Sequence, residues 1–535
     1  MYITPQTNIK LLTNVPLEPE YTHSLYFGSA SAQQSYFAGK AKYNLNAYTY
    51  QRYAKGVLRV QILADNLYDV NYMMFQNTAF GNKWFYAFVD KVEYVNDVTT
   101  EIQYHIDDIQ TWLFNFTFKQ CFIERQHSTT DEIGDNILAE PVELGEYVYS
   151  SYSRDITIGQ TSLRQRAIIV AVTDINEDSQ ETADGEVYDG IYGACKLFAY
   201  SADTTGVQLV NAKINEFITD GHPDSVVSIY MCPRAMVNSY VNTGTKIAYG
   251  SSGALIDGLT LDSVGATIDG YNPKNKKLFT YPYNYQSITT GDGEELVLRF
   301  EFFENQTPRV NVFGCLSQPV QVMCCPTNYK NVNRAGGELS SYPDFVDEKI
   351  VLTSFPLCSW NIDSWKAWTA QNAIPTVLKV LGGAGSVAVG MAGRGEGASM
   401  ANAGLYALHT ATDLLTTMYK ASIMADQTKG SISSANALFS RMDYTFHHGR
   451  KCINRQQASI IDSFFTRFGY AYNKVGTPNI HARTAFTYIK TLDCSIHGEL
   501  PADSEKVIEN AFNSGITFWT NPSGVGDYTV TNSPL

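Results

Sequence analysis

Short segments in which apolar and polar residues alternate recur along most of this chain and predict a mainly β protein, of the β-rich α+β class. They lie at 56–62, 83–106, 116–127, 166–175, 193–201, 225–231 and 295–314. Asn96 and Asp97 divide the second segment and predict a hairpin, because both residue types tolerate turn conformations. A further turn is expected from Asn305 to Pro308. The composition agrees, since 35 tyrosines and only 17% charged residues favour strands over long surface helices.

Helix signals concentrate near the C-terminal end. Residues 405–428 are good helix formers. Residues 501–515 predict another helix, which begins near Pro501 and Asp503 and stops at Gly515. Its apolar stripe is expected to contain Val507, Ile508 and Phe512.

Size and charge limit the possible functions. A chain of 535 residues exceeds one hydrophobic core, so we expect several domains. Composition changes near 128–145, which is polar and acidic, and near 365–440, which is rich in small apolar residues. The net charge of −14 excludes a cationic nucleic-acid-binding surface over the chain as a whole. The N-terminus, MYITPQTNIKLL, has no basic region followed by an apolar core, and we expect no secretory signal there.

The nine cysteines form no CxxC pair. This pattern favours buried free thiols over a disulfide framework or a zinc site. They are Cys121, Cys195, Cys232, Cys315, Cys324, Cys325, Cys358, Cys452 and Cys494.

A glycine motif at Gly383, Gly385 and Ala388 matches the dinucleotide turn G-x-G-x-x-A, but its surroundings do not fit nucleotide binding. The motif needs an acidic residue about 20 positions later. Glu396 comes too early and Asp413 too late. Glycine also recurs too often for the helix that would bind the pyrophosphate.

Carboxylate pairs give no strong enzyme signal. Asp107 and Asp108 could cleave a glycoside, but neighbouring strand residues point to opposite faces, so turn formation or helix capping is the better interpretation. Residues 174–185 begin like a calcium loop, with Ser179 where glycine is required and Gly185 where glutamate is required.

Histidine also gives no clear metal signal. His447 and His448 lie near Cys452, but adjacent histidines are not a metal-ligand spacing by themselves. No recognisable catalytic motif accompanies them, and we expect neither a metal site, nor a cofactor, nor an enzyme.

One apolar stretch, residues 377–408 (VLKVLGGAGSVAVGMAGRGEGASMANAGLYAL), is built mainly from Gly, Ala, Val, Ser and Met. A permanent membrane-spanning helix is disfavoured, because Lys379, Arg394, Glu396 and Asp413 divide it into uncharged arms shorter than the ~20 residues that a span needs. A buried core helix remains an alternative, although such helices favour larger side chains on one stripe. We predict instead a loop, about 374–412, that contacts a membrane only when it is triggered to do so. Its candidate membrane-interacting residues are Val377, Leu378, Val380, Leu381, Val387, Val389, Met391, Met400, Leu405, Tyr406 and Leu408.

Four stretches carry a resemblance to a known family. Residues 72–89 (YMMFQNTAFGNKWFYAFV), 105–127, 459–500 and 512–519 (FNSGITFW) resemble the tail knob proteins of phi29-like short-tailed bacteriophages. The resemblance implies β-barrel-type tube domains that assemble into a hexameric ring or tube at the distal tail tip. Its channel would conduct the genome, and long hydrophobic loops would plug it and later act on the host membrane. Residues 377–408 stand where the family has such a loop.

The resemblance and the composition together predict a domain layout. Residues 1–125 and 440–535 are expected to form one discontinuous tube body, 126–364 a β-rich knob insertion, and 365–439 the hydrophobic loop with its following helix. The implied partners are five further copies of the chain, upper tail tube or collar proteins, viral double-stranded DNA and the host membrane. The implied place is the distal end of the virion tail, after synthesis in the host cytoplasm. The alternative function is a host-surface adhesin of the tail with an exposed aromatic groove.

Overall fold

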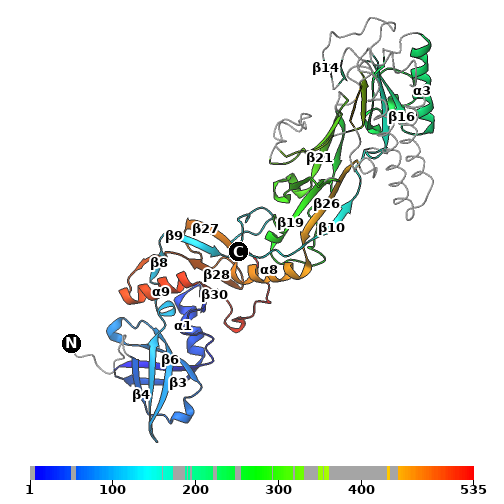
Figure 1. Ribbon diagram of the computed structural model, residues 1–535. Helices are drawn as coiled ribbons and strands as arrows, with labels where there is room; N and C mark the ends of the chain where they lie inside the picture. Colours follow the sequence, from blue (N-terminus) through cyan, green and yellow to red (C-terminus); the bar gives the residue numbers. More distant parts are fainter. Residues whose placement is uncertain are drawn as a thin grey trace. The chain divides into compact units, whose positions relative to one another are not determined.

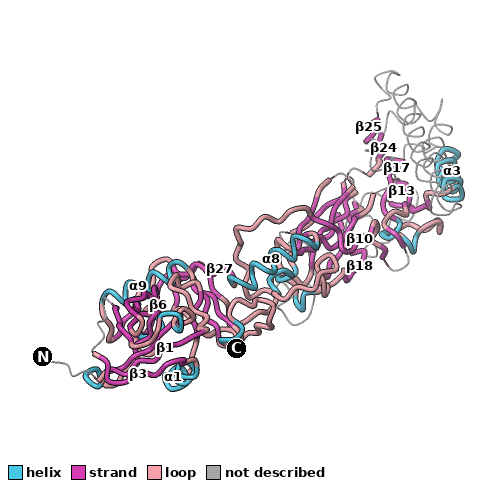
Figure 2. The backbone as a smooth tube through the Cα atoms, turned by 90° about the horizontal axis from the view of Figure 1, so that it is seen from below, coloured by secondary structure: helices cyan, strands magenta, loops and turns pink. Residues whose placement is uncertain are grey.

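The computed structural model divides the chain into two compact units (Figure 1). The terminal unit contains residues 1–144, 273–278 and 456–535, and the insert unit contains 145–272 and 279–455. The described residues are 6–49, 56–158, 161–172, 187–188, 191–192, 196–220, 226–247, 255–291, 293–316, 320–330, 348–353, 355–360, 430–433 and 444–535. Strands and loops make up most of them (Figure 2), which confirms the prediction of a mainly β fold.

The N-terminal part of the terminal unit is a six-stranded antiparallel sheet. In spatial order its strands are β3 (Ala41–Tyr48), β1 (Thr7–Thr13), β5 (Val70–Gln76), β6 (Phe85–Asn96), β7 (Thr99–Ile106) and β4 (Gly56–Val60). β6 and β7 pair around Asn96, Asp97 and Val98, so the predicted hairpin is confirmed.

Both faces of this sheet are covered. Successive strand residues point to opposite faces, and β5 is apolar on both. Met73 and Phe75 join one hydrophobic core with Ile9 and Ile102. Tyr72 and Met74 join another core on the opposite face, and that core also includes Phe486 and Trp519 from the C-terminal end of the chain.

The second sheet of the terminal unit combines strands from both ends of the chain. Its order is β2 (His23–Leu25), β30 (Ile516–Trp519), β28 (Phe486–Thr491), β9 (Cys121–Gln126) and β27 (Tyr470–Gly476). β2 pairs with β30 in parallel, and the other pairs are antiparallel. The predicted strand 116–127 is divided, because its first residues form β8 (Phe116–Phe118), which pairs with β29 (Ile496–Gly498). The two chain ends therefore fold as one sheet.

Four helices accompany these sheets. They are α1 (Ala30–Gly39), α2 (Asp108–Trp112), α8 (Arg455–Phe468) and α9 (Ala502–Ser514). α9 is the predicted C-terminal helix, with Pro501 at its N-cap and Gly515 at its C-cap. The predicted stripe was wrong at Val507, which is exposed. The buried side chains of this helix are Ser504, Ile508, Ala511 and Phe512. They lie on one face, because residues three or four positions apart share a helix face.

The insert unit contains three larger sheets. One has the order β10 (Tyr147–Ser153), β26 (Phe446–Ile453), β19 (Asn284–Thr290) and β20 (Glu295–Leu298). Another has the order β16 (Lys196–Ser201), β13 (Arg166–Val172), β17 (Val226–Pro233), β24 (Leu357–Trp360) and β25 (Gly430–Ser433). The third has the order β18 (Leu255–Thr260), β21 (Arg309–Cys315), β22 (Gln321–Pro326) and β23 (Ile350–Leu352). Two-residue strand pairs, Thr157–Ile158 with Thr161–Ser162 and Val187–Tyr188 with Ile191–Tyr192, complete the described strands.

Helix α3 (Thr204–Thr219) packs on the five-stranded sheet through Val207, Val210 and Ile214. The opposite face of that sheet joins the main core of the insert unit, with Ile169 and Tyr230. The turn expected from Asn305 to Pro308 is confirmed, since Glu304–Gln306 form a 3₁₀ turn and β21 begins at Arg309. The expected strand before it is shorter than predicted, because β20 ends at Leu298 and Phe300–Phe302 form another 3₁₀ turn. Phe300 and Phe303 are both buried, and strand positions three residues apart would point to opposite faces.

The unit boundaries differ from the expected layout. β26 pairs with β10 and β19 in the insert unit, so the terminal unit resumes at 456 rather than at 440. Residues 126–144 and 273–278 also belong to the terminal unit.

Six of the nine cysteines are described as free, and all six are buried as expected: Cys121, Cys232, Cys324, Cys325, Cys452 and Cys494.

Candidate functional site

The eleven candidate membrane-interacting residues, from Val377 to Leu408, lie outside the described residues. So do the glycine motif at Gly383, the acidic loop 174–185 and the predicted helix 405–428. Within the described part of the chain, no helix is long and apolar enough to cross a membrane. These assignments therefore remain predictions.

Asp107 and Asp108 have separate roles, as the capping interpretation expected. Asp107 is the N-cap of α2, and its carboxylate accepts a 2.9 Å hydrogen bond from the backbone N–H of Gln110. The other carboxylate oxygen accepts a 2.8 Å hydrogen bond from the hydroxyl of Tyr72. Asp108 begins the helix, where a negative charge is favourable.

His447 and His448 lie on β26. Nδ1 of His447 is 2.8 Å from the hydroxyl of Tyr152, and burial lowers the pKa of His448. Among the residues that the structure describes, no group of three or more His, Cys, Asp or Glu side chains is placed to hold a metal ion.

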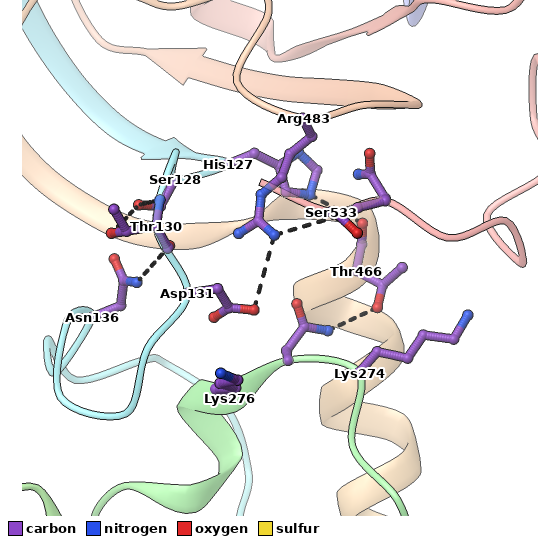
Figure 3. Close-up of polar contacts among 12 residues, drawn as sticks. His127, Ser128, Thr130, Asp131, Asn136, Lys274, Lys276, Thr466, Arg483 and Ser533 are labelled. Atoms are coloured by element: carbon purple, nitrogen blue, oxygen red, sulfur yellow. Dashed lines mark hydrogen bonds and ion pairs between the residues drawn. The ribbon is translucent and has the colours of Figure 1, made fainter. Parts of the chain in front are cut away.

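A polar pocket lies in the terminal unit (Figure 3). Its volume is about 380 Å³, and its walls come from 127–132, 274–276, Thr466 of α8, Arg483 and the C-terminal segment 529–534. Sequence reasoning missed this pocket, because no single segment contains a recognisable motif. We call it the junction pocket.

His127 forms part of the wall in a fixed neutral state. Its Nδ1 accepts a 2.8 Å hydrogen bond from the backbone N–H of Tyr488. Its Nε2 is 3.1 Å from the carbonyl oxygen of Thr466, which requires Nε2 to donate. Burial, and then the charge of Arg483, lower the pKa of His127 to about 3. The ring therefore carries no charge near neutral pH.

Arg483 and Asp131 face each other inside the pocket (Figure 3). Nη1 of Arg483 is 3.9 Å from Oδ2 of Asp131, which is too long for a hydrogen bond. Oδ1 of Asp131 instead accepts a 2.6 Å hydrogen bond from the hydroxyl of Tyr470. Burial raises the pKa of Asp131, while Tyr470 and Arg483 oppose that rise.

Segment 273–278 is held in the terminal unit by two carboxylates. Asp462 of α8 accepts hydrogen bonds from the backbone N–H groups of Lys274, at 2.9 Å, and Asn275, at 3.0 Å. Glu140 pairs with both Lys277 and Arg125, and its side chain is fully buried. These contacts hold residues 274–276, which form one wall of the pocket.

Exposed tyrosines form a second feature, in the insert unit. Tyr147, Tyr149 and Tyr152 of β10 are 39%, 44% and 47% exposed. With Tyr285 of β19 and Lys451 of β26 they make up what we call the tyrosine face. The ring centroids of Tyr149 and Tyr152 are 5.0 Å apart, and those of Tyr147 and Tyr285 are 5.5 Å apart.

The rings of the tyrosine face are held in place. Tyr149 lies against Gly449, where a Cβ atom would approach its ring to 2.9 Å. The hydroxyl of Tyr147 donates to the carbonyl oxygen of Pro282 at 3.1 Å, and Nζ of Lys451 lies 5.1 Å from the Tyr149 centroid. Aromatic rings that are ordered in advance lose little freedom on contact with a ligand.

Comparison with protein families gives the identity of this architecture. Residues 255–533 match a family model described as the C-terminal domain of the Bacillus phage phi29 tail knob protein gp9. That match covers more than half of the chain. The chain belongs to the phi29-type tail knob protein family.

Other comparisons agree. The tail knob proteins gp9 of Bacillus phages PZA, B103 and phi29 are 26%, 25% and 24% identical to this chain. Each alignment covers 98% of this chain and 98% of the relative. Residues 5–117, which include the six-stranded sheet, match a model described as the N-terminus of caudoviral major tail proteins. The solved structure of the bacteriophage C1 tail knob protein, gp12, aligns with a TM-score of 0.60 and 16% identity, over 99% of this chain and 100% of that one. This likeness shows a common fold.

Family membership confirms the resemblance found in the sequence. The chain is a structural component of a short bacteriophage tail and is located in the virion. It is not an enzyme, since its relatives are tail knob proteins.

Proposed function

We propose that this tail knob protein forms the distal tip of the tail as a hexameric ring, with a channel through which the viral genome leaves. Residues 377–408 first plug this channel and then penetrate the host cytoplasmic membrane. Upper tail tube or collar proteins continue the channel toward the capsid. Family membership supports the place in the tail, and one observation within the insert unit supports the role of the apolar segment.

That observation concerns the strand pair β24 (Leu357–Trp360) and β25 (Gly430–Ser433), which flanks residues 361–429 in the sequence. We call this pair the neck. Trp360, the last residue of β24, pairs with Gly430, the first residue of β25, in an antiparallel ladder. Residues 361–429 therefore begin and end at adjacent positions. β25 is also the last strand of its sheet. The described fold therefore holds both ends of this segment at one edge of a sheet, through two neighbouring strands.

The sequence of the segment suits a movable hairpin better than a single span. There are 14 uncharged residues between Lys379 and Arg394, and 16 between Glu396 and Asp413. Two short apolar arms can fold against each other with the charges at their turn. Small residues allow close packing between helices in lipid, and neighbouring copies in a ring can share the cost of polar groups.

DNA passes through such a channel without sequence-specific binding. The net charge of −14 for each chain disfavours tight binding of DNA by the protein as a whole, because binding to phosphates requires clusters of Lys and Arg. We expect no submicromolar binding of duplex DNA by the isolated protein at physiological salt.

Electron microscopy of the purified protein tests the ring. The six-stranded sheet has β3 and β4 at its edges, and closure into a ring would cover strand edges that otherwise favour aggregation. Six-fold particles with a central channel are the expected result. A monomer at every concentration, or an open filament, would contradict the proposal.

The tyrosine face favours a second function, adhesion to the host surface. A β-bulge between Tyr149 and Ser151 interrupts β10, which is the edge strand of its sheet. Bulges disfavour the addition of a further strand, so a partner is more readily bound on the face than along the edge. Fixed rings beside the ion pair of Lys451 and Glu295 suit a polysaccharide, which offers both apolar ring faces and hydroxyl groups.

A further inference from the structure

The junction pocket contains a buried guanidinium group that the protein satisfies poorly. Arg483 is 4% exposed. Its Nη1 donates one long hydrogen bond, 3.4 Å, to the carbonyl oxygen of Asn532, and its Nε has no partner. A guanidinium has several N–H donors, and a buried charge without acceptors is costly. An acceptor inside the pocket would therefore lower the free energy of this site.

The charges around the pocket favour an anion. Lys274 and Lys276 add two cations to that of Arg483, while Asp131 and Glu132 supply two carboxylates. His127 adds no charge, because its pKa is lowered to about 3. One positive charge is left in excess. Glu132 is already paired with Lys276 at 2.8 Å, which leaves Asp131 as the carboxylate that competes for Arg483.

The volume of the pocket indicates more than a bare ion. About 380 Å³ is several times the ~30 Å³ that a water molecule occupies in the liquid, and it falls at the small end of ligand pockets. Thr529, Thr531, Asn532 and Ser533 line one wall. The hydroxyl of Thr529 is already bonded to Asp527, and the side-chain amide of Asn532 is already bonded to the backbone of Ala485 and Phe486. The hydroxyl groups of Thr531 and Ser533 suit a small molecule with hydroxyls beside its charged group.

We propose that the junction pocket binds a small organic oxyanion, a hydroxylated molecule with one carboxylate or phosphate group, and that Arg483 holds the oxyanion. Arginine is well suited to this role, because its planar fork matches both carboxylate and phosphate oxygens. The bound molecule contacts segment 274–276 and the C-terminal segment 529–534 together, so it stabilises the terminal unit where these segments meet.

Calorimetric titration of the full chain tests this site. The probes are inorganic phosphate for the phosphate group and gluconate for a hydroxylated carboxylate, each compared with chloride at the same ionic strength. We expect saturable binding of at least one probe, and the stronger of the two identifies the charged group. Two substitutions then change affinity in opposite directions. Arg483→Lys keeps the charge but loses the fork, and it weakens binding about tenfold. Asp131→Asn removes the competing carboxylate and tightens binding.

Lys490→Gln is the control, because Lys490 lies in the same unit and pairs with Glu124 away from the pocket. Its affinity for the probes should equal that of the wild type. Absence of saturable binding in the wild type overturns the proposal, as does equal affinity in Arg483→Lys. Where Arg483→Lys does not fold, Asp131→Asn decides alone, and equal or weaker binding by that variant rejects the site.

Discussion

The hydroxyl of Tyr72, on β5, donates a 2.8 Å hydrogen bond to the carboxylate of Asp107, at the start of α2, and both side chains are buried in the terminal unit. Burial raises the pKa of Asp107 from 3.8 to about 7, although the hydrogen bonds from Gln110 and Tyr72 oppose the rise. The folded protein therefore holds a proton here that the unfolded chain releases at much lower pH.

This relationship predicts a loss of stability with rising pH. Because the folded pKa of Asp107 is the higher one, its contribution is complete below about pH 4 and is lost as pH rises to about 7. Asp107→Asn cannot ionise and keeps the capping oxygen. Relative to this variant, the wild type should lose roughly 4 kcal/mol of unfolding free energy between pH 4 and pH 8. Denaturant unfolding across that range measures the difference, and two parallel pH profiles would refute the assignment.

Gly515 should not tolerate a side chain. It ends α9 with φ at 95°, and a Cβ atom there would collide with the phenol oxygen of Tyr488. We expect Gly515→Ala to destabilise the protein by about 1–3 kcal/mol in thermal or denaturant unfolding. Gly524→Ala is the control, since its nearest neighbour would be 4.0 Å away. Equal stability of the two variants would show that the strain is absent.

Glu140 should be essential for the stability of the terminal unit. Its buried carboxylate pairs with Lys277 and Arg125 and accepts a 2.9 Å hydrogen bond from the backbone N–H of Ala471. Glu140→Gln leaves two buried cations without a counter-charge and should cost about 3–5 kcal/mol. Glu132→Gln, which breaks the exposed pair with Lys276, should cost less than about 1 kcal/mol. Similar unfolding midpoints for both variants would count against the buried pair.

The tyrosine face predicts a binding defect without a folding defect. Tyr149→Ala removes an exposed ring that lies on Gly449, and it should weaken binding to purified host cell-wall polysaccharide about tenfold. Tyr94→Ala is the control, because Tyr94 is 57% exposed in the terminal unit. If neither variant changes binding while Tyr149→Ala disrupts assembly, the face covers another copy of the chain instead.

Local signals in the sequence predicted local structure. The hairpin at Asn96 and Asp97 and the end of α9 at Gly515 follow from the conformational preferences of single residues. The 3₁₀ turn at Phe300–Phe302 did not, because it depends on the burial of neighbouring Phe303 in the core of the insert unit, which is a long-range effect. The same limit explains why α8, whose buried Asp462 holds residues 274 and 275, was not predicted.

The junction pocket shows that limit more strongly. Arg483 and Asp131 are far apart in the sequence, and neither belongs to a motif. They meet because β28 and β9 pair and because segment 273–278 returns to the terminal unit. The family was recognisable because runs such as GNKWFYAFV are specific even where long-range contacts cannot be derived.

The central claim, that residues 377–408 open a path through a membrane, is tested most directly by dye release from liposomes. The intact protein is compared with a deletion of 377–408, which leaves the neck residues Leu357–Trp360 and Gly430–Ser433 in place. A second variant, Val389→Asp, places a charge in one apolar arm at a cost of about 3 kcal/mol in lipid. We predict leakage from the intact protein under a triggering condition, little from Val389→Asp and none from the deletion. Equal leakage from the intact and deleted proteins, or none from the intact protein under any triggering condition, would contradict the account.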